Sequence, residues 1–194
     1  KFNAYNALVA IMICYLIDVP TKDIQNTLPQ VHVLGRGQVM HVSPDYSVLI
    51  DYAHNGVSFE SIISTVEQYN PNKLIVVYGS GGKRSKTRRY ESGEVVAKHG
   101  GYSILTADNP RGEKIVDICK DIVVGIDKYH GEYTIIPDRK EAIYHALDMA
   151  CKGDVVLLLG KGHETYMIGE DEVTRHFSET EVLEEYKKER GLNA

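Results

Sequence analysis

The residues with the clearest chemical potential form the stretch Asp108-Asn109-Pro110-Arg111, where an apolar run ends in a polar tip. Pro110 cannot donate a ladder hydrogen bond and restrains Asn109 to extended geometry, so a preceding strand must stop there. The guanidinium of Arg111 can bind the carboxylate of a small ligand through two parallel hydrogen bonds. An Asx turn beside a surface arginine would explain the same four residues.

Two glycine-rich segments could bind charged groups. Residues 79–84, Gly-Ser-Gly-Gly-Lys-Arg, supply backbone N–H groups and two cations, which suit a phosphate or a carboxylate. They match neither a Walker A loop nor a dinucleotide-binding fingerprint. Residues 160–164, Gly-Lys-Gly-His-Glu, place Glu164 where it could accept from an ammonium group. A cleft with Arg84 and Arg111 on one side and Glu164 on the other would suit an amino acid, whose two charges need opposite partners.

Two histidines, His54 and His163, lie inside polar motifs and invite a catalytic or a metal-binding interpretation. Neither belongs to a pair spaced four residues apart, and no cysteine cluster accompanies them, so the sequence favours no metal site. We expect the remaining histidines at the surface.

The composition limits the possible classes of protein. A chain of 194 residues can hold one ordinary domain plus a fragment, and 43% apolar with 25% charged residues is typical of a soluble globular protein. The net charge of −5 gives no reason to expect a nucleic-acid partner. Three widely separated cysteines without Cys-x-x-Cys spacing favour a reducing compartment. The apolar run 7–17, about 11 residues, is too short to cross a membrane.

Five short apolar runs, each followed by a polar loop, predict the strands that must position these motifs. The expected strands are 47–50, 74–78, 103–107, 133–136 and 155–159. Continuously apolar strands separated by helical patterns are typical of a parallel sheet covered on both faces. We therefore predict a doubly wound, mostly parallel, Rossmann-like α/β sheet of about 155 residues. A short hairpin, 166–168 with 173–177, should follow it.

Polar residues at the expected helix starts predict the caps. We expect Thr21, Ser58, Asp138 and Ser178 to cap helices, the last two with a glutamate three residues later. The helix from Ser58 should place Tyr69 on its apolar face.

The first residues form a different pattern from the rest of the chain. Residues 3–17 predict a helix that is apolar nearly all round and therefore buried. Pro20 ends it, and the turn-rich segment 29–37 predicts a domain boundary, with a short helical segment 1–34 before an α/β domain 35–194. Because the chain begins inside this pattern without a methionine, we expect a piece of a longer protein.

Parallel strands share one carboxyl edge, so the loops that follow them should meet. This would bring Asp51 and His54 together with residues 79–84, 108–111 and 160–164. We therefore predict one binding cleft at this edge of the sheet.

The order of these motifs resembles the Mur ligases over almost the whole chain. The matching residues are Phe2-Asn3-x-Tyr5-Asn6-Ala7-Leu8, Gly35-Arg36, Asp51-Tyr52-Ala53-His54, Gly81-Gly82-x-Arg84, Asp108-Asn109-Pro110-Arg111 and Gly160-Lys161-Gly162-His163-Glu164. Asp-Tyr-Ala-His is shared with folylpolyglutamate synthetases. Asp-Asn-Pro-Arg with Gly-Lys-Gly-His-Glu is more specific, and is similar to family members that add meso-diaminopimelate rather than lysine.

The resemblance implies an ATP-dependent amide ligase of cytoplasmic peptidoglycan precursor synthesis. The carboxylate of UDP-MurNAc-L-Ala-D-Glu would become an acyl phosphate, which the amine of the diamino acid attacks. Family members have three domains, so residues 1–34 would be the tail of the central ATPase domain and 35–194 the C-terminal domain. ATP and Mg²⁺ would be bound mainly by the central domain, outside this chain. The chain alone should therefore be inactive, and its partners would be the two small-molecule substrates and its own other domains.

The resemblance also assigns residues to ligands. The diamino acid would be held by Arg84, Asp108, Asn109, Pro110, Arg111, Gly160 and Glu164. ATP would have Asn6 by the adenine, Asp51 by the ribose, and Arg36 and His54 near the phosphates. No catalytic residue or metal ligand is expected within the chain. Arg111 would bind the second carboxylate of meso-diaminopimelate, which lysine lacks, and burying it without that partner would cost about 2–4 kcal/mol.

Three departures from the family pattern leave alternatives open. Asn55-Gly56 stands where Thr-Pro is usual, residues 85–90 lack the usual Asp and Lys-Arg-Pro, and Lys114-Ile115 replaces an acidic residue and proline. The alternatives are a related ligase that adds lysine, or glutamate to a folate, and a non-catalytic binding module.

Overall fold

The computed structural model describes residues 2–31 and 33–192, with the side chains of residues 2–4 outside the description. The chain divides into two compact units, Lys1–Val33 and Leu34–Ala194. No helix among the described residues is long and apolar enough to cross a membrane. The side chains of Phe2 and Asn3, which begin the first motif, and His32 lie outside the described part.

The first unit consists of α1 (Phe2–Leu16), α2 (Thr21–Thr27) and the short 3-10 helix η1 (Leu28–Gln30). The expected cap at Thr21 is wrong: Pro20 takes the capping position and no side chain caps α2. The expected burial of α1 is also wrong within the described residues, because Leu8, Met12 and Leu16 are 54%, 62% and 77% exposed. α2, with seven residues, is too short to cover a helix of fifteen residues that is apolar nearly all round.

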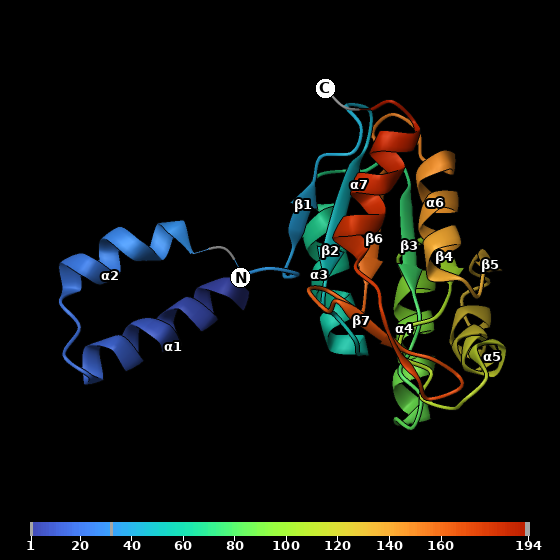
Figure 1. Ribbon diagram of the computed structural model, residues 1–194, viewed down its shortest axis with the longest axis horizontal. Coiled ribbons are helices and arrows are strands. Elements are labelled where there is room, and N and C mark those ends of the chain that lie inside the picture. The colour runs from blue at the N-terminus through green and yellow to red at the C-terminus, as the bar shows by residue number, and fades with distance from the viewer. Residues whose placement is uncertain (1, 32, 193–194) are drawn as a thin grey trace. The chain divides into compact units, whose positions relative to one another are not determined.

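The second unit is built on a six-stranded sheet with the order β1-β2-β6-β3-β4-β5 (Figure 1). Its strands are β1 (Gln38–Met40), β2 (Ser47–Asp51), β3 (Leu74–Tyr78), β4 (Tyr102–Leu105), β5 (Tyr133–Ile135) and β6 (Val155–Leu159). All neighbouring pairs are parallel except β1 with β2. The predicted doubly wound, mostly parallel sheet is confirmed. The sequence analysis missed β1, a three-residue edge strand with no continuous apolar run.

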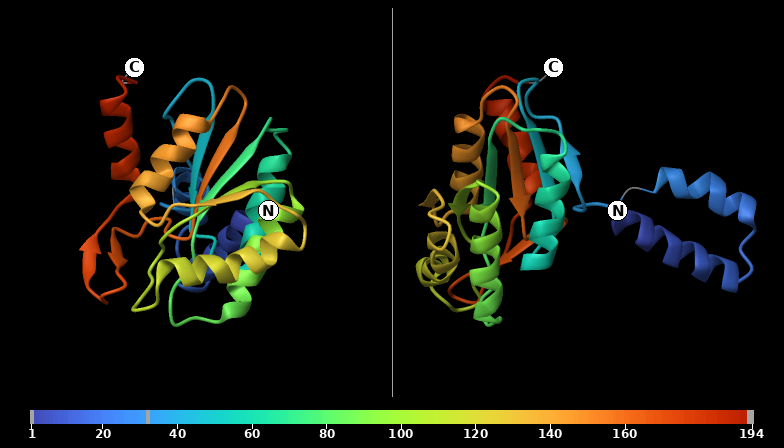
Figure 2. Two further views of the ribbon diagram at one scale, coloured as in Figure 1. Left: turned by 90° about the vertical axis from the view of Figure 1, so that its right-hand side faces the viewer. Right: turned by 180° about the vertical axis from the view of Figure 1, so that it is seen from behind.

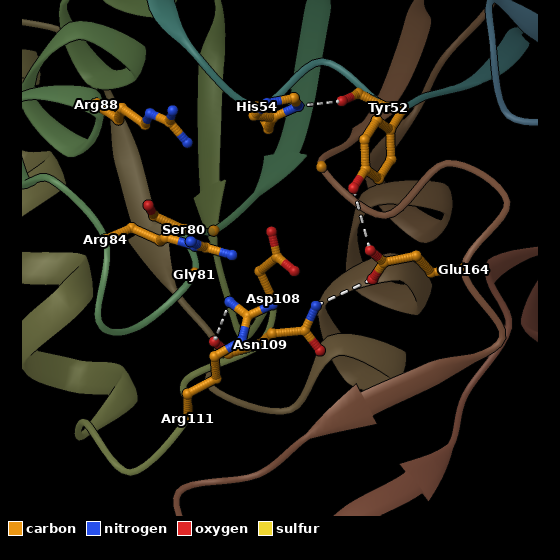
Figure 3. A pocket seen from close by; sticks show the side chains of 12 residues that line it. Tyr52, His54, Ser80, Gly81, Arg84, Arg88, Asp108, Asn109, Arg111 and Glu164 are labelled. Carbon is orange, nitrogen blue, oxygen red and sulfur yellow. Dashed lines mark hydrogen bonds between the residues drawn. The ribbon is translucent and has the colours of Figure 1, made fainter. Parts of the chain in front are cut away.

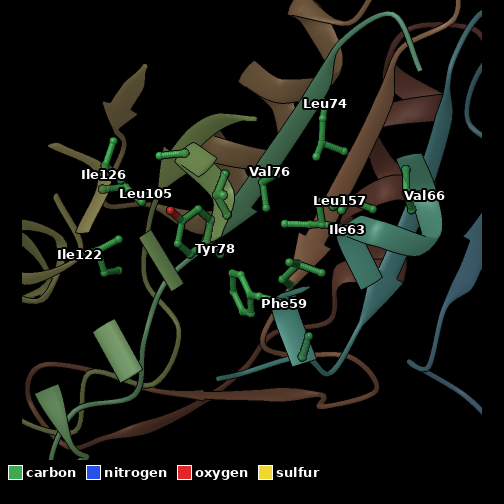
Figure 4. Close-up of a cluster of buried hydrophobic side chains, with 14 of the residues drawn as sticks. Phe59, Ile63, Val66, Leu74, Val76, Tyr78, Leu105, Ile122, Ile126 and Leu157 are labelled. Carbon is green, nitrogen blue, oxygen red and sulfur yellow. The ribbon is translucent and has the colours of Figure 1, made fainter. Parts of the chain in front are cut away.

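Helices cover both faces of the sheet (Figure 2). One face carries α3 (Gly56–Glu67), α4 (Lys86–Lys98) and α5 (Ile115–Asp127), and the other carries α6 (Arg139–Met149) and α7 (Glu179–Glu189). Successive strand residues supply the two cores alternately: Val76 and Tyr78 pack toward α3–α5 (Figure 4), whereas Ile75 and Val77 pack toward α6 and α7. This explains why β3 is apolar at every position, since both of its faces are buried.

The structure confirms two predicted caps and corrects a third. The side chains of Asp138 and Ser178 accept hydrogen bonds from the backbone N–H groups three residues later. At α3 the cap is Asn55 rather than Ser58. Asn55 Oδ1 accepts from the Ser58 N–H at 3.0 Å, and Ser58 Oγ accepts from the Asn55 N–H at 3.2 Å. Tyr69 lies beyond the end of this helix and is 81% exposed, so its predicted place on the apolar face is wrong.

One histidine expected at the surface is largely buried. The side chain of His99 is 14% exposed, and its two ring nitrogens lie 2.8 Å from Glu67 and 3.0 Å from Glu60. Burial alone would lower the pKa of His99, but its hydrogen bonds to Glu67 and Glu60 outweigh this and raise it. His99 thereby joins the end of α4 to α3.

The predicted hairpin is present as β7 (Tyr166–Ile168) and β8 (Thr174–His176), an antiparallel pair separate from the main sheet. It lies against the loop after β4. The Ile168 N–H donates to Asn109 Oδ1 at 2.9 Å, and the Arg111 N–H donates to the Ile168 carbonyl at 3.4 Å. The hairpin therefore supports the Asp-Asn-Pro-Arg segment from one side.

Candidate functional site

A pocket of about 250 Å³ lies at the carboxyl edge of the sheet (Figure 3). It gathers the loops that follow β2, β3, β4 and β6, as the strand pattern predicted. Its lining residues are Tyr52, His54, Gly79, Ser80, Gly81, Arg84, Arg88, Asp108, Asn109, Arg111, Gly160 and Glu164.

Glycine is required in these loops because they approach one another closely. A Cβ on Gly82 would lie 1.7 Å from the Pro110 carbonyl oxygen, and the Gly82 N–H donates to the Asn109 carbonyl at 2.8 Å. Gly160 has a φ of +108°, and a Cβ there would lie 3.0 Å from Asp108 Oδ2. Gly82 therefore joins the loops after β3 and β4, and Gly160 lets the loop after β6 approach Asp108.

One side of the pocket is lined by Asp108, Asn109, Glu164 and Tyr52; together with the buried Lys161, which does not line the pocket, we call these residues the acid flank. Lys161 is fully buried, and its Nζ lies 2.9 Å from Glu164 Oε2 and 3.8 Å from Asp108 Oδ1. Glu164 also accepts from Asn109 Nδ2 at 3.0 Å and from the Tyr52 hydroxyl at 3.3 Å (Figure 3). Its carboxylate is therefore held in one orientation by three donors on three different loops.

Two pKa shifts follow from this network. Burial alone would raise the pKa of Glu164, but the hydrogen bonds from Lys161, Asn109 and Tyr52 outweigh it, and the pKa lies below its ordinary value. Burial and the nearby Glu164 carboxylate raise the pKa of Tyr52. Glu164 is thus an ionised acceptor and Tyr52 a neutral donor at neutral pH.

The opposite side, which we call the arginine flank, contains Arg84, Arg88 and Arg111 (Figure 3). Arg84 and Arg88 are exposed, and within residues 2–31 and 33–192 their side chains form no hydrogen bond or ion pair. Arg111 is partly buried, and among the described residues its guanidinium donates only through Nη1, to the Asn109 carbonyl at 3.5 Å. The three guanidiniums are therefore available to an anion, with the acid flank facing them.

Other residues expected at the site have different positions. Pro110 does not line the pocket but brings its carbonyl against Gly82.

Three further residues were expected near ATP. Arg36 lies over the Tyr52 ring, 5.3 Å from its centroid. The two oxygens of Asp51 accept backbone N–H bonds from Gly37 and Ala53, each at 2.7 Å. Asn6 is an exposed residue of the first unit.

Sequence reasoning missed Arg88, which lines the pocket, and Lys161, which is buried beside Glu164. Arg88 lies in the first turn of α4, four residues after Arg84, which belongs to the loop before the helix. Lys161 was considered only as part of a glycine-rich motif, although its burial between acids makes it the internal counter-ion of the acid flank. No spacing rule shows that a lysine between two glycines is buried.

A covered parallel sheet with a charged pocket at its carboxyl edge defines a ligand-binding α/β domain. Residues 35–162 match the sequence model described as "Mur ligase, glutamate ligase domain". The chain belongs to this family.

Relatives and solved structures agree with this assignment. The chain is 41% identical over 184 residues to the UDP-N-acetylmuramoyl-L-alanyl-D-glutamate--2,6-diaminopimelate ligase of Caldanaerobacter subterraneus, covering 95% of this chain and 38% of the relative. It is 40% identical over 185 residues to the ligase of the same name from Clostridium perfringens, covering 94% and 38%. The chain thus spans about two-fifths of the length of these relatives.

Two solved structures share the fold. A UDP-N-acetylmuramoyl-L-alanyl-D-glutamate--2,6-diaminopimelate ligase has a TM-score of 0.74 at 27% identity, covering 98% of this chain and 39% of that one. The UDP-N-acetylmuramate-alanine ligase of Thermotoga maritima has a TM-score of 0.68 at 14% identity, covering 98% and 38%. The second likeness shows the fold alone.

Proposed function

We propose that this chain is the C-terminal part of an ATP-dependent ligase that adds meso-diaminopimelate to UDP-MurNAc-L-Ala-D-Glu during cytoplasmic peptidoglycan precursor synthesis. The observation that carries the proposal is the pair of opposed flanks in one pocket, with Arg84, Arg88 and Arg111 facing Asp108 and Glu164. A ligand with a carboxylate and an ammonium group at one end fits this arrangement. The names of the relatives supply the particular amino acid.

Within the pocket, the carboxylate at one end of the diamino acid would face Arg84, Arg88 and Arg111. The ammonium group at the same end would face Asp108 and Glu164. This orientation leaves the other amine free to react with the activated acceptor. Lysine has an ammonium group but no carboxylate at its side-chain end, so it would leave the arginine flank without its anion.

ATP would activate the acceptor carboxylate, and we propose that it is bound with Mg²⁺ mainly by a preceding domain. The chain has no Gly-Lys-Ser or Gly-Lys-Thr sequence, the part of a Walker A loop that holds phosphates and magnesium. In the second unit, Arg36, Asp51 and His54 would contact the nucleotide. His54 lines the pocket, which suits a place near a phosphate. Asp51 would bind the ribose through its remaining lone pairs.

The test uses the whole protein that contains this chain. Release of inorganic phosphate from ATP is measured with UDP-MurNAc-L-Ala-D-Glu and, in turn, meso-diaminopimelate, lysine or glutamate. We expect turnover with meso-diaminopimelate and at least about a hundredfold lower kcat/KM with lysine, since one charged hydrogen-bonded contact is lost. Equal turnover with lysine would contradict the proposed substrate. No turnover with any amino acid would favour a binding module.

Two substitutions of Arg111 sharpen this test. Arg111→Ala removes the cation, and Arg111→Lys keeps the charge but not the planar fork. We expect both to raise the KM for meso-diaminopimelate, the first by about a hundredfold and the second by about tenfold. An unchanged KM in Arg111→Ala would mean that Arg111 does not contact the amino acid.

A further inference from the structure

Arg139 is a fully buried arginine outside the pocket, at the first residue of α6. Its Nη1 donates to the Ala107 carbonyl at 2.8 Å, and its Nη2 donates to the Leu159 carbonyl at 2.8 Å. Ala107 and Leu159 are the residues directly before Asp108 and Gly160, both of which line the pocket. A single guanidinium therefore binds the backbone of two segments, in each case at the residue that precedes a pocket residue.

The two carbonyls belong to chain segments that the sheet does not join. β4 and β6 are separated by β3 in the sheet order, so no ladder hydrogen bond links them. Past the strand ends, the loops after β4 and β6 nevertheless approach closely, because a Cβ on Gly160 would lie 3.0 Å from Asp108 Oδ2. The guanidinium of Arg139 is a direct hydrogen-bonded bridge between these two segments.

Glu179, the first residue of α7, provides the counter-charge. Its Oε1 accepts from Arg139 Nε at 3.0 Å and from Nη2 at 2.7 Å, and both side chains are 0% exposed. Its Oε2 is buried and has no hydrogen-bond partner among the described residues. A buried ion pair with an unsatisfied oxygen is a poor source of stability, because desolvation of both charges offsets their attraction. The position of the pair next to the two pocket segments therefore indicates its role better than any contribution to stability.

We propose that Arg139 is a positioning residue of the amino-acid pocket, and that its guanidinium sets the separation between the 108–109 and 160–161 segments; this rests on the proposed function. Asp108 and Asn109 belong to the first segment. Lys161 belongs to the second, and Glu164 follows it three residues later. The acid flank forms only when the two segments meet. Arg139 acts through these residues and does not contact the ligand.

The first experiment compares Arg139→Lys with Leu147→Ala in the whole protein. A lysine keeps the charge but cannot bind both carbonyls and Glu179 in the same planar geometry. Leu147 is a buried apolar residue of the same helix that does not line the pocket, so its truncation destabilises without altering the bridge. We expect Arg139→Lys to raise the KM for meso-diaminopimelate about tenfold or more with the KM for ATP unchanged. We expect Leu147→Ala to leave both KM values unchanged.

The second experiment separates position from stability. The double variant Arg139→Met with Glu179→Leu replaces the ion pair by apolar groups of similar volume, a change that often preserves or increases stability. Because the Ala107 and Leu159 carbonyls nevertheless lose their donor, we expect a lower thermal midpoint than that of the wild type. Well below that midpoint, where the double variant is folded, we expect a KM for meso-diaminopimelate that is still raised about tenfold. A folded double variant with the wild-type KM would overturn the proposal.

The outcomes separate this inference from the proposed function. If the wild-type protein turns over no amino acid, the proposed function fails. If the wild type is active but Arg139→Lys has the kinetics of Leu147→Ala, the positioning role fails and the proposed function remains.

Discussion

The two flanks of the pocket differ in how their charges are held. In the acid flank, Lys161 is fully buried and Asp108 is 8% exposed, and Glu164 accepts hydrogen bonds from three side chains. In the arginine flank, Arg84 and Arg88 are exposed and, in the described part of the chain, their side chains have no partner. The acid flank is therefore held by internal hydrogen bonds in the folded domain, whereas the guanidiniums of Arg84 and Arg88 are open to an anion.

This difference separates the roles of the two flanks. Desolvating the charges of the acid flank is a cost of folding, which the internal hydrogen bonds offset. Ordering the long side chains of the arginine flank is a cost of binding. Substitutions in the acid flank should therefore change stability, and substitutions of Arg84 or Arg88 should change affinity alone.

The largest effect is expected for Lys161→Met, which leaves Glu164 and Asp108 without their buried counter-ion. Removing one partner of a buried pair typically costs about 3–5 kcal/mol of unfolding free energy. Urea unfolding followed by circular dichroism measures it. The matched control is Lys83→Met, which breaks the exposed pair of Lys83 with Glu172 and should cost less than about 1 kcal/mol. Equal losses in the two variants would mean that the acid flank is no more organised than the surface.

The second effect is expected in binding, from Arg84→Ala and Arg88→Ala. We expect each to raise the KM for meso-diaminopimelate about tenfold in the whole protein, because a charge-assisted contact to the ligand is lost. The unfolding free energy should change by less than about 0.5 kcal/mol, since the residues are exposed. A large loss of stability would show that these arginines already have a structural partner.

The third effect is a pH dependence of stability. The folded-state pKa of Glu164 lies below its ordinary value, so its contribution is present above the unfolded pKa of about 4.3 and is lost as the pH falls through the folded value. Glu164→Gln removes this titration. The difference in unfolding free energy between the wild type and Glu164→Gln should be constant above about pH 5 and shrink below about pH 4. A difference that grows on acidification would mean that the pKa is raised instead.

The smallest effect is expected for Tyr52→Phe, which deletes one donor to Glu164. The hydrogen bond is long, at 3.3 Å, and the other two donors remain. We expect a loss of about 0.5–1.5 kcal/mol in unfolding free energy, with a slight rise of the Glu164 pKa. Proton-detected titration of Glu164 by NMR measures the second quantity. A loss as large as that of Lys161→Met would place Tyr52, not Lys161, at the centre of the network.

Much of the fold could be predicted because its signals are local. The buried strands are continuous apolar runs, and the loops after them carry glycine, proline and charge, so the parallel sheet and the meeting of four loops follow from the pattern. Short or atypical elements were missed for the same reason. β1 has three residues and no apolar run, and Asn55 caps α3 through a box that uses an amide and a hydroxyl rather than a glutamate.

The sequence by itself determined the order of the five parallel strands and their helices along the chain, the edge at which the polar loops gather, and the kinds of charge that these loops carry. Only the tertiary structure decided which charges are buried and bonded, such as Lys161 and Arg139, and which are exposed, such as Arg84 and Arg88. The physical reason is that burial and hydrogen bonding depend on residues from distant parts of the chain. Arg139 contacts Ala107, Leu159 and Glu179 in the folded domain although all three are at least 20 residues away in sequence, and no local pattern indicates these contacts.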